Sequence, residues 1–89
     1  MGTVNIQTDI PGPKSKELAE RRTKAVVDAH SSVAPVYTAK AEGATITDVD
    51  GNVFIDFAGG IGAMNTGHGN PVITDEIKNQ VGDYLHVCF

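Results

Sequence analysis

A glycine-rich stretch constrains this chain more than any other part of it. The stretch from Asp48 to Pro71 holds six of the ten glycines, most of them within residues 58–69. Glycine loses more conformational entropy on folding than any other residue and adopts positive φ readily. We therefore expect residues 58–69 to form neither helix nor strand. This coil would let other groups approach the backbone closely.

Short regular elements are predicted before this coil. A helix is expected from Lys16 to about Asp28, with the Ser15 hydroxyl as its N-cap. Asp-Gly between apolar runs predicts a hairpin turn over residues 48–52. Strands are predicted over three ranges, 36–42, 45–48 and 53–57, and the second of them is rich in β-branched residues.

A second helix is predicted after the coil. Asn70 is a good N-cap, and Pro71 suits the first helical position. The apolar residues of this helix recur at a spacing of three to four, which places them on one face. They are Ile73, Ile77, Val81 and Tyr84.

The composition of this chain argues against some classes of binding partner. The formal net charge of −4 argues against nucleic acid or an anionic membrane surface, because binding to phosphate relies on Lys and Arg. The single cysteine, Cys88, cannot form an internal disulfide and fits a reducing compartment. No apolar run approaches the ~20 residues of a membrane span. We expect a cytoplasmic protein without nucleic acid or membrane partners.

The spacing of residues excludes two ligand-binding motifs, a dinucleotide-binding fingerprint and a calcium loop. A dinucleotide fingerprint needs G-x-G-x-x-G at a strand-to-helix turn, whereas from Gly60 the chain reads G-I-G-A-M-N. A calcium loop starting at Asp48 needs glycine at its sixth position and glutamate at its twelfth. Those positions hold Val53 and Gly59. Residues 48–52 are therefore expected to be a turn.

The polar side chains near the coil are predicted to be structural. His68 has no partner at metal-ligand spacing, so its ring is expected to bond to backbone in the turn. Asp56 is expected to accept hydrogen bonds from neighbouring backbone N–H groups rather than to transfer protons. Ile61, flanked by Gly60 and Gly62, can either fill a core or form the wall of a cavity. No catalytic residue and no metal site is predicted.

The stretch from Asp48 to Pro71 resembles the N-terminal segment of class III pyridoxal-phosphate-dependent aminotransferases. The shared pattern is D-x-D-G-N-x-F-I-D-F-x-G-G-I-x-x-x-N-x-G-H-x-x-P. Residues 11–18 and the following Arg21-Arg22 look most like the 4-aminobutyrate branch of this family. The resemblance covers nearly all of the chain.

This resemblance implies a fold. It is an α+β segment, with a helix, a small antiparallel sheet and a helix, of an α/β pyridoxal-phosphate-dependent transferase with the aspartate-aminotransferase-like fold. Residues 1–14 would be an extended arm, and residues 15–89 an incomplete N-terminal domain. The family position that matches Ile61 lines the substrate pocket, and Gly60 leaves room for ligand. Both are therefore expected to bind substrate.

The resemblance also implies pyridoxal 5'-phosphate as the cofactor of the parent enzyme, with no cofactor-binding residue in this chain. The expected reaction moves the amino group of 4-aminobutyrate to 2-oxoglutarate. The expected partners are the rest of the subunit, a second subunit in a homodimer or larger assembly, and a small amino-acid substrate. None of the lysines stands in the Schiff-base motif, so the 89 residues alone are expected to be inactive. These lysines are Lys14, Lys16, Lys24, Lys40 and Lys78.

A second interpretation stays open. Residues 84–89 end the chain on mostly apolar side chains, which favours the front of a longer chain. The alternative is a stand-alone module without catalysis that self-associates through apolar faces of its strands and last helix. Such faces would otherwise promote aggregation.

Overall fold

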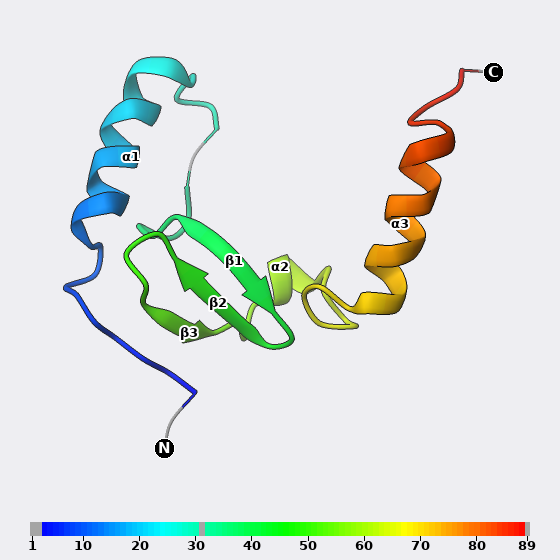
Figure 1. The fold of residues 1–89 in the computed structure, drawn as a ribbon. Helices are drawn as coiled ribbons and strands as arrows, with labels where there is room; N and C mark the ends of the chain where they lie inside the picture. The colour runs from blue at the N-terminus through cyan, green and yellow to red at the C-terminus, as the bar shows by residue number, and fades with distance from the viewer. Residues whose placement is uncertain (1–2, 31, 89) are drawn as a thin grey trace.

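The computed structural model describes residues 3–30 and 32–88 and shows a small sheet with helices on either side (Figure 1). The elements in chain order are α1 (Pro13–Ala25), β1 (Thr38–Glu42), β2 (Thr45–Asp48), β3 (Val53–Ile55), α2 (Gly59–Gly62) and α3 (Pro71–Asp83). The predicted arrangement of a helix, a small antiparallel sheet and a helix is confirmed.

The strands form one antiparallel sheet in the order β1-β2-β3. Thr45, the first residue of β2, lies opposite Ile55 at the end of β3. Because β2 begins at Thr45, Asp56 and Phe57 have no partner strand among the described residues. β3 therefore ends two residues before its predicted limit. β1 begins at Thr38, two residues later than predicted, since the preceding N–H bonds to a side chain of α1.

α1 begins and ends three residues earlier than predicted. Gly12 is its N-cap, and Pro13 takes the first helical position, where a missing N–H costs nothing. The prediction of Ser15 as the cap is wrong. Ser15 lies buried in the first turn, and its Oγ accepts a hydrogen bond from the Tyr37 N–H at 3.2 Å. The two β-branched valines that follow α1 favour extended backbone, which explains the early end.

The arm before α1 is held by the turn between β2 and β3. Asn52 is fully buried there, and its Oδ1 accepts hydrogen bonds from the N–H groups of Gln7 at 2.6 Å and Thr8 at 3.0 Å. Its Nδ2 donates to Asp48 Oδ2 at 3.0 Å. Of the predicted arm over residues 1–14, the last two residues belong to α1, and residues 1 and 2 lie outside the described residues.

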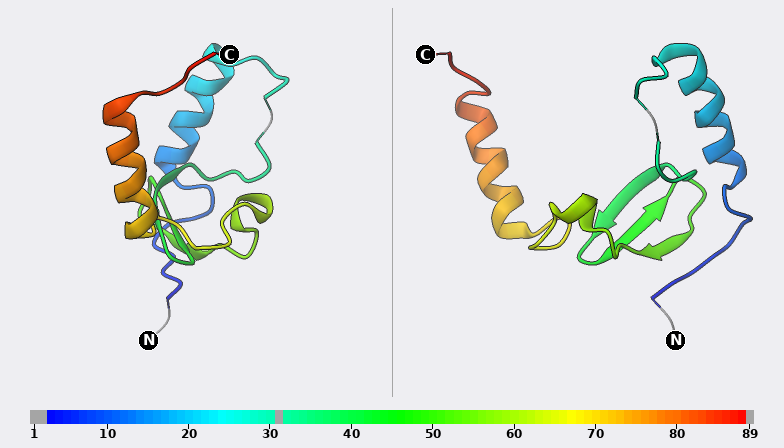
Figure 2. Two further views of the ribbon diagram at one scale, coloured as in Figure 1. Left: turned by 90° about the vertical axis from the view of Figure 1, so that its right-hand side faces the viewer. Right: turned by 180° about the vertical axis from the view of Figure 1, so that it is seen from behind.

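α3 begins as predicted. Asn70 Oδ1 accepts a hydrogen bond from the Val72 N–H at 3.1 Å, and the proline follows the cap directly. The predicted apolar stripe is 41 to 56% exposed. Figure 2 shows α3 and α1 rising from opposite ends of the sheet, far from one another. The stripe therefore has no partner among the described residues.

The described residues bury no hydrophobic side chain. The buried side chains are polar and belong to Ser15, Asp48 and Asn52. The Cα radius of gyration is 16.0 Å, compared with about 12 Å for a compact domain of this length. Burial of apolar surface is the main favourable term in folding, and here most of that surface stays free for other contacts.

Candidate functional site

The loop between β3 and α3 starts and ends beside the β1–β2 turn. The Asp56 N–H donates to the Ala44 carbonyl at 2.9 Å. At the other end, His68 and Gly43 exchange two backbone hydrogen bonds, at 2.8 and 2.9 Å. Residues 57–67 therefore form a loop whose ends lie side by side. Compact surface loops of this kind frequently carry function.

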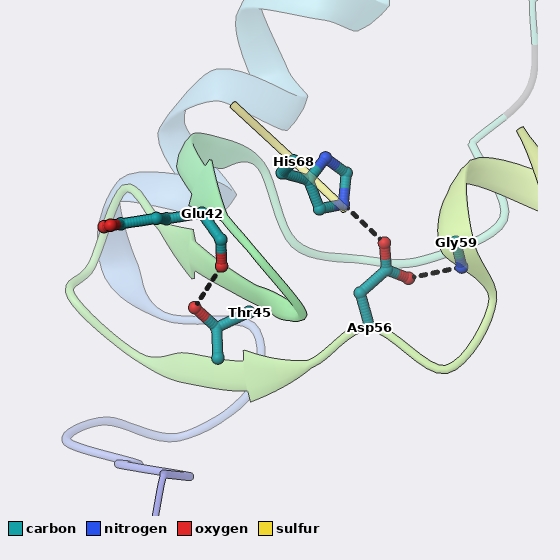
Figure 3. A network of polar contacts seen from close by, with 5 residues as sticks. All are labelled: Glu42, Thr45, Asp56, Gly59 and His68. Carbon is teal, nitrogen blue, oxygen red and sulfur yellow. Dashed lines mark hydrogen bonds and ion pairs between the residues drawn. The ribbon is translucent and has the colours of Figure 1, made fainter. Parts of the chain in front are cut away.

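Asp56 and His68 also join their side chains across the base of this loop (Figure 3). His68 Nε2 lies 2.6 Å from Asp56 Oδ2, and the two side chains are 19% and 8% exposed. Asp56 Oδ1 accepts a hydrogen bond from the Gly59 N–H at 2.9 Å. The bond from His68 lowers the pKa of Asp56; burial opposes this effect, and the bond from Gly59 adds to it. Asp56 is thus ionised at neutral pH.

The direction of the bond between the two side chains follows from that ionisation. An ionised carboxylate only accepts hydrogen bonds, so His68 Nε2 carries a hydrogen and its N–H donates a hydrogen bond to Asp56 Oδ2. The prediction that Asp56 accepts from backbone is confirmed at Gly59. The prediction that the His68 ring bonds to backbone is wrong, because the ring bonds to a carboxylate. Sequence reasoning missed this pair, which is twelve positions apart and has no local signal.

The loop contains a left-handed turn, α2, where only coil was predicted. The φ angles are +56° at Gly59, +64° at Gly60, +59° at Ile61 and +79° at Gly62. The Gly62 N–H closes the turn by donating to the Ala58 carbonyl at 2.9 Å. Left-handed helical backbone costs L-residues roughly 1–2 kcal/mol each, whereas glycine adopts it freely. The glycine density thus produces a left-handed turn rather than irregular coil.

Ile61 stands out in this turn. It is the single residue other than glycine with positive φ in the part of the chain that the structure describes. For a β-branched residue this is a genuine outlier, with a strain of about 1–3 kcal/mol. Its side chain is 89% exposed, so it fills no core of the described chain. Whether it forms the wall of a cavity or fills a core in the rest of the protein stays open. Contact with substrate stays a prediction.

The lysines lie apart from the loop that carries Ile61. All five lysines are exposed, and none lies in a pocket near Ile61. Within residues 3–30 and 32–88, no cluster of histidine, cysteine and acidic side chains could hold a metal ion. A groove of about 390 Å³ runs along α1, away from the loop. Leu18 and Tyr37 are among the residues that line it. No helix described here has both the length and the hydrophobicity to cross a membrane.

Known proteins are similar to this chain over most of its length. The family described as Aminotransferase class-III matches residues 26–89. A 4-aminobutyrate aminotransferase of Mycobacterium bovis is 40% identical over 84 residues, which is 94% of this chain and 19% of that protein. A 5-aminovalerate aminotransferase of Pseudomonas aeruginosa is 40% identical over 75 residues, 84% of this chain and 18% of that protein.

A third relative carries a different name. An alanine/serine racemase of Pyrococcus horikoshii is 42% identical over 72 residues, covering 80% of this chain and 15% of that protein. The chain spans less than a fifth of the length of each of these three relatives. Segments similar to this chain thus occur in proteins named for different reactions.

Proposed function

The chain belongs to the class-III aminotransferase family, and we propose that it is the N-terminal segment of an enzyme that moves the amino group of 4-aminobutyrate to 2-oxoglutarate. The products are succinate semialdehyde and glutamate. The observation that carries this proposal is the 40% identity over 84 residues to a protein named 4-aminobutyrate aminotransferase. A second relative is named for 5-aminovalerate, an ω-amino acid that is one methylene longer than 4-aminobutyrate. This name supports an ω-amino acid as the substrate class.

Pyridoxal 5'-phosphate is the inferred cofactor, because the class III family depends on it generally. It supplies the electron sink for amino transfer. We assign the lysine that binds it and the groups that hold its phosphate to the protein outside residues 1–89, since none of the five lysines stands in the Schiff-base motif of the family. The aspartate-aminotransferase-like α/β fold is inferred for the whole protein on the same family grounds.

Ile61 and Gly60 are assigned to the substrate pocket. Ile61 exposes an apolar side chain on a strained turn, and such a side chain suits the methylene chain of an ω-amino acid. Gly60 has φ of +64°, and a Cβ there would lie 3.3 Å from Met64 Cγ. A larger residue would therefore strain the turn and displace its neighbour.

The free apolar surface is assigned to contacts with the rest of the subunit and with a second subunit. The α3 stripe is about half exposed, and Phe57 is 92% exposed. Exposed apolar patches of this kind mark contact sites. We infer a cytoplasmic location for the whole protein. The net charge of −4 of these 89 residues gives no support for nucleic acid or an anionic membrane as a partner.

The test uses the whole protein that carries this segment, purified with pyridoxal phosphate. Glutamate formation from 2-oxoglutarate is measured with 4-aminobutyrate, 5-aminovalerate, ornithine, N-acetylornithine and alanine as donors. We expect the highest kcat/KM with 4-aminobutyrate. A higher value with another donor would overturn the substrate. Racemisation of alanine without glutamate formation would overturn the reaction. The 89-residue chain with the cofactor is the control and is expected to form no glutamate.

The exposed apolar surface also supports a second candidate, the stand-alone module that self-associates without catalysis. Light scattering on the isolated chain after size-exclusion chromatography separates the two candidates. An oligomer of defined size with cooperative unfolding supports the module. A disordered or aggregating chain supports a segment that needs the rest of an enzyme.

A further inference from the structure

The Asp56 carboxylate connects the base of the loop to the turn inside it. One oxygen, Oδ1, accepts the Gly59 N–H at the start of α2 at 2.9 Å. The other oxygen, Oδ2, lies 2.6 Å from His68 Nε2. Hydrogen bonds to an ionised group are shorter and stronger than neutral ones. The carboxylate therefore fixes the start of the turn relative to His68.

Both residues of the pair are themselves fixed to the sheet. The Asp56 N–H bonds to Ala44, and the main chain of His68 pairs with Gly43. Ala44 and Gly43 are neighbours in the β1–β2 turn. The backbones of Asp56 and His68 are therefore both hydrogen-bonded to the β1–β2 turn. Through them, the left-handed turn has a defined position relative to the sheet.

The turn has few other restraints among the described residues. Its main-chain hydrogen bonds are internal, such as those from Gly62 to Ala58 and from Met64 to Gly59, at 2.9 and 2.8 Å. The side chain of Ile61 is 89% exposed, so packing against the other described residues contributes little to holding it. In the part of the chain that is described, the one side chain that bonds to α2 is that of Asp56.

We propose that Asp56, supported by His68, is a positioning residue for substrate specificity, which holds the left-handed turn so that Ile61 faces the substrate. The proposal rests on the proposed function. Asp56 does not touch the substrate; it acts through Ile61. Its effect falls on the binding of the methylene chain and on the preference between 4-aminobutyrate and 5-aminovalerate.

The test is a double-mutant cycle of Asp56→Ala and Ile61→Ala in the whole protein with its cofactor. Asp56→Ala is expected to raise KM for 4-aminobutyrate about tenfold and to change kcat less than about threefold, because a displaced wall weakens binding without moving the reacting groups. In the Ile61→Ala background, the same change is expected to raise KM less than about twofold, since the wall is already gone. If Asp56→Ala raises KM by the same factor with and without Ile61→Ala, the two residues act independently and the proposal is overturned.

Asp50→Ala is the matched control. Asp50 also accepts two N–H groups with its carboxylate, but at the start of α1. Its removal is expected to lower stability and to leave KM unchanged. An equal rise in KM would mean general loosening and would overturn positioning by Asp56. His68→Gln keeps an N–H donor and is expected to keep KM closer to the wild-type value than His68→Leu does; equal values would overturn the role of His68.

Hydrogen exchange gives a readout that does not depend on activity. The Gly62 and Met64 amides are bonded within the turn, so their exchange reports on the turn itself. Asp56→Ala is expected to speed this exchange at least about tenfold, and Asp50→Ala to leave it unchanged. Unchanged exchange in Asp56→Ala would overturn the proposal. If the whole protein transfers no amino group, the proposed function fails, while the exchange data still decide whether Asp56 holds the turn.

Discussion

Asp50 in the β2–β3 turn accepts a hydrogen bond from the Ser15 N–H at the start of α1, at 3.0 Å and across 35 residues of sequence. Its other oxygen accepts the Lys14 N–H at 2.8 Å. The first N–H groups of a helix have no partner within the helix, and the N-cap, Gly12, has no side chain to offer. The hairpin turn therefore caps the helix and ties it to the sheet.

Gly12→Ala is expected to lower the free energy of unfolding by about 1–3 kcal/mol, the usual cost of overpacking. Gly12 is buried, and an added Cβ would overlap Asp50 Cγ and lie 2.7 Å from Thr8 Oγ1. Asp50 would have to leave the helix start. Urea unfolding of the whole protein measures the change.

Gly82→Ala is the control for this substitution. Gly82 lies in α3 with open space around it, so alanine is expected to stabilise the helix by roughly 0.5–1 kcal/mol. Effects of the same sign at both glycines would contradict the role of the contact between Gly12 and Asp50.

Acid is expected to release α1 from the sheet. Burial opposes ionisation of Asp50, but the N–H groups of Lys14 and Ser15 outweigh it and hold the pKa of Asp50 below its ordinary value. Such a carboxylate stabilises the fold at every pH above its unfolded pKa, about 4, and this contribution is lost as pH falls from there through the folded pKa. Below pH ~4, the urea midpoint of the wild type is expected to fall more steeply than that of Asp50→Asn. Parallel curves would contradict this.

Local capping was predictable where the partners are neighbours. Asn70 caps α3 through the N–H two residues later, and the Asp-Gly turn joins adjacent strands, so short-range sequence preferences suffice. Ser15 shows where prediction of helix caps from the local sequence fails. Its residue type predicts a cap, but the carboxylate that caps α1 comes from Asp50, which no window around the helix contains.

In the candidate site, too, some features follow from the local sequence and others depend on tertiary contacts. Glycine density predicts positive φ over residues 58–69, but not that four such residues follow one another in a left-handed turn. The pairing of Asp56 with His68 depends on both ends of the loop meeting the β1–β2 turn, which is a tertiary contact. The two environments that the sequence leaves open for Ile61 depend on contacts outside its own loop, and its side chain is 89% exposed among the described residues.

Ile61→Asn is expected to move stability and activity in opposite directions. Asparagine tolerates left-handed backbone, so the free energy of unfolding is expected to rise by about 0.5–1 kcal/mol as strain is relieved. Loss of the apolar wall is expected to lower kcat/KM for 4-aminobutyrate about tenfold. Unfolding and steady-state kinetics of the whole protein measure the two effects.

Ile61→Val is the matched variant, because it keeps the β-branched apolar side chain. It is expected to change kcat/KM less than about threefold and to leave the strain in place. If Ile61→Asn lowers stability as well as activity, the backbone at this position is not strained in the whole protein.

Two apolar residues on α3 test whether the rest of the protein covers its stripe. Ile77 lies in the stripe, whereas Val72 lies on the face of Asp75 and Glu76 and is 73% exposed. In the whole protein, Ile77→Ala is expected to cost about 2–4 kcal/mol, as in a core. Val72→Ala is expected to cost less than about 0.5 kcal/mol, as on a surface. Unfolding free energies are compared. Equal small costs would mean that the stripe stays exposed, and the assigned contact with the rest of the subunit would be wrong.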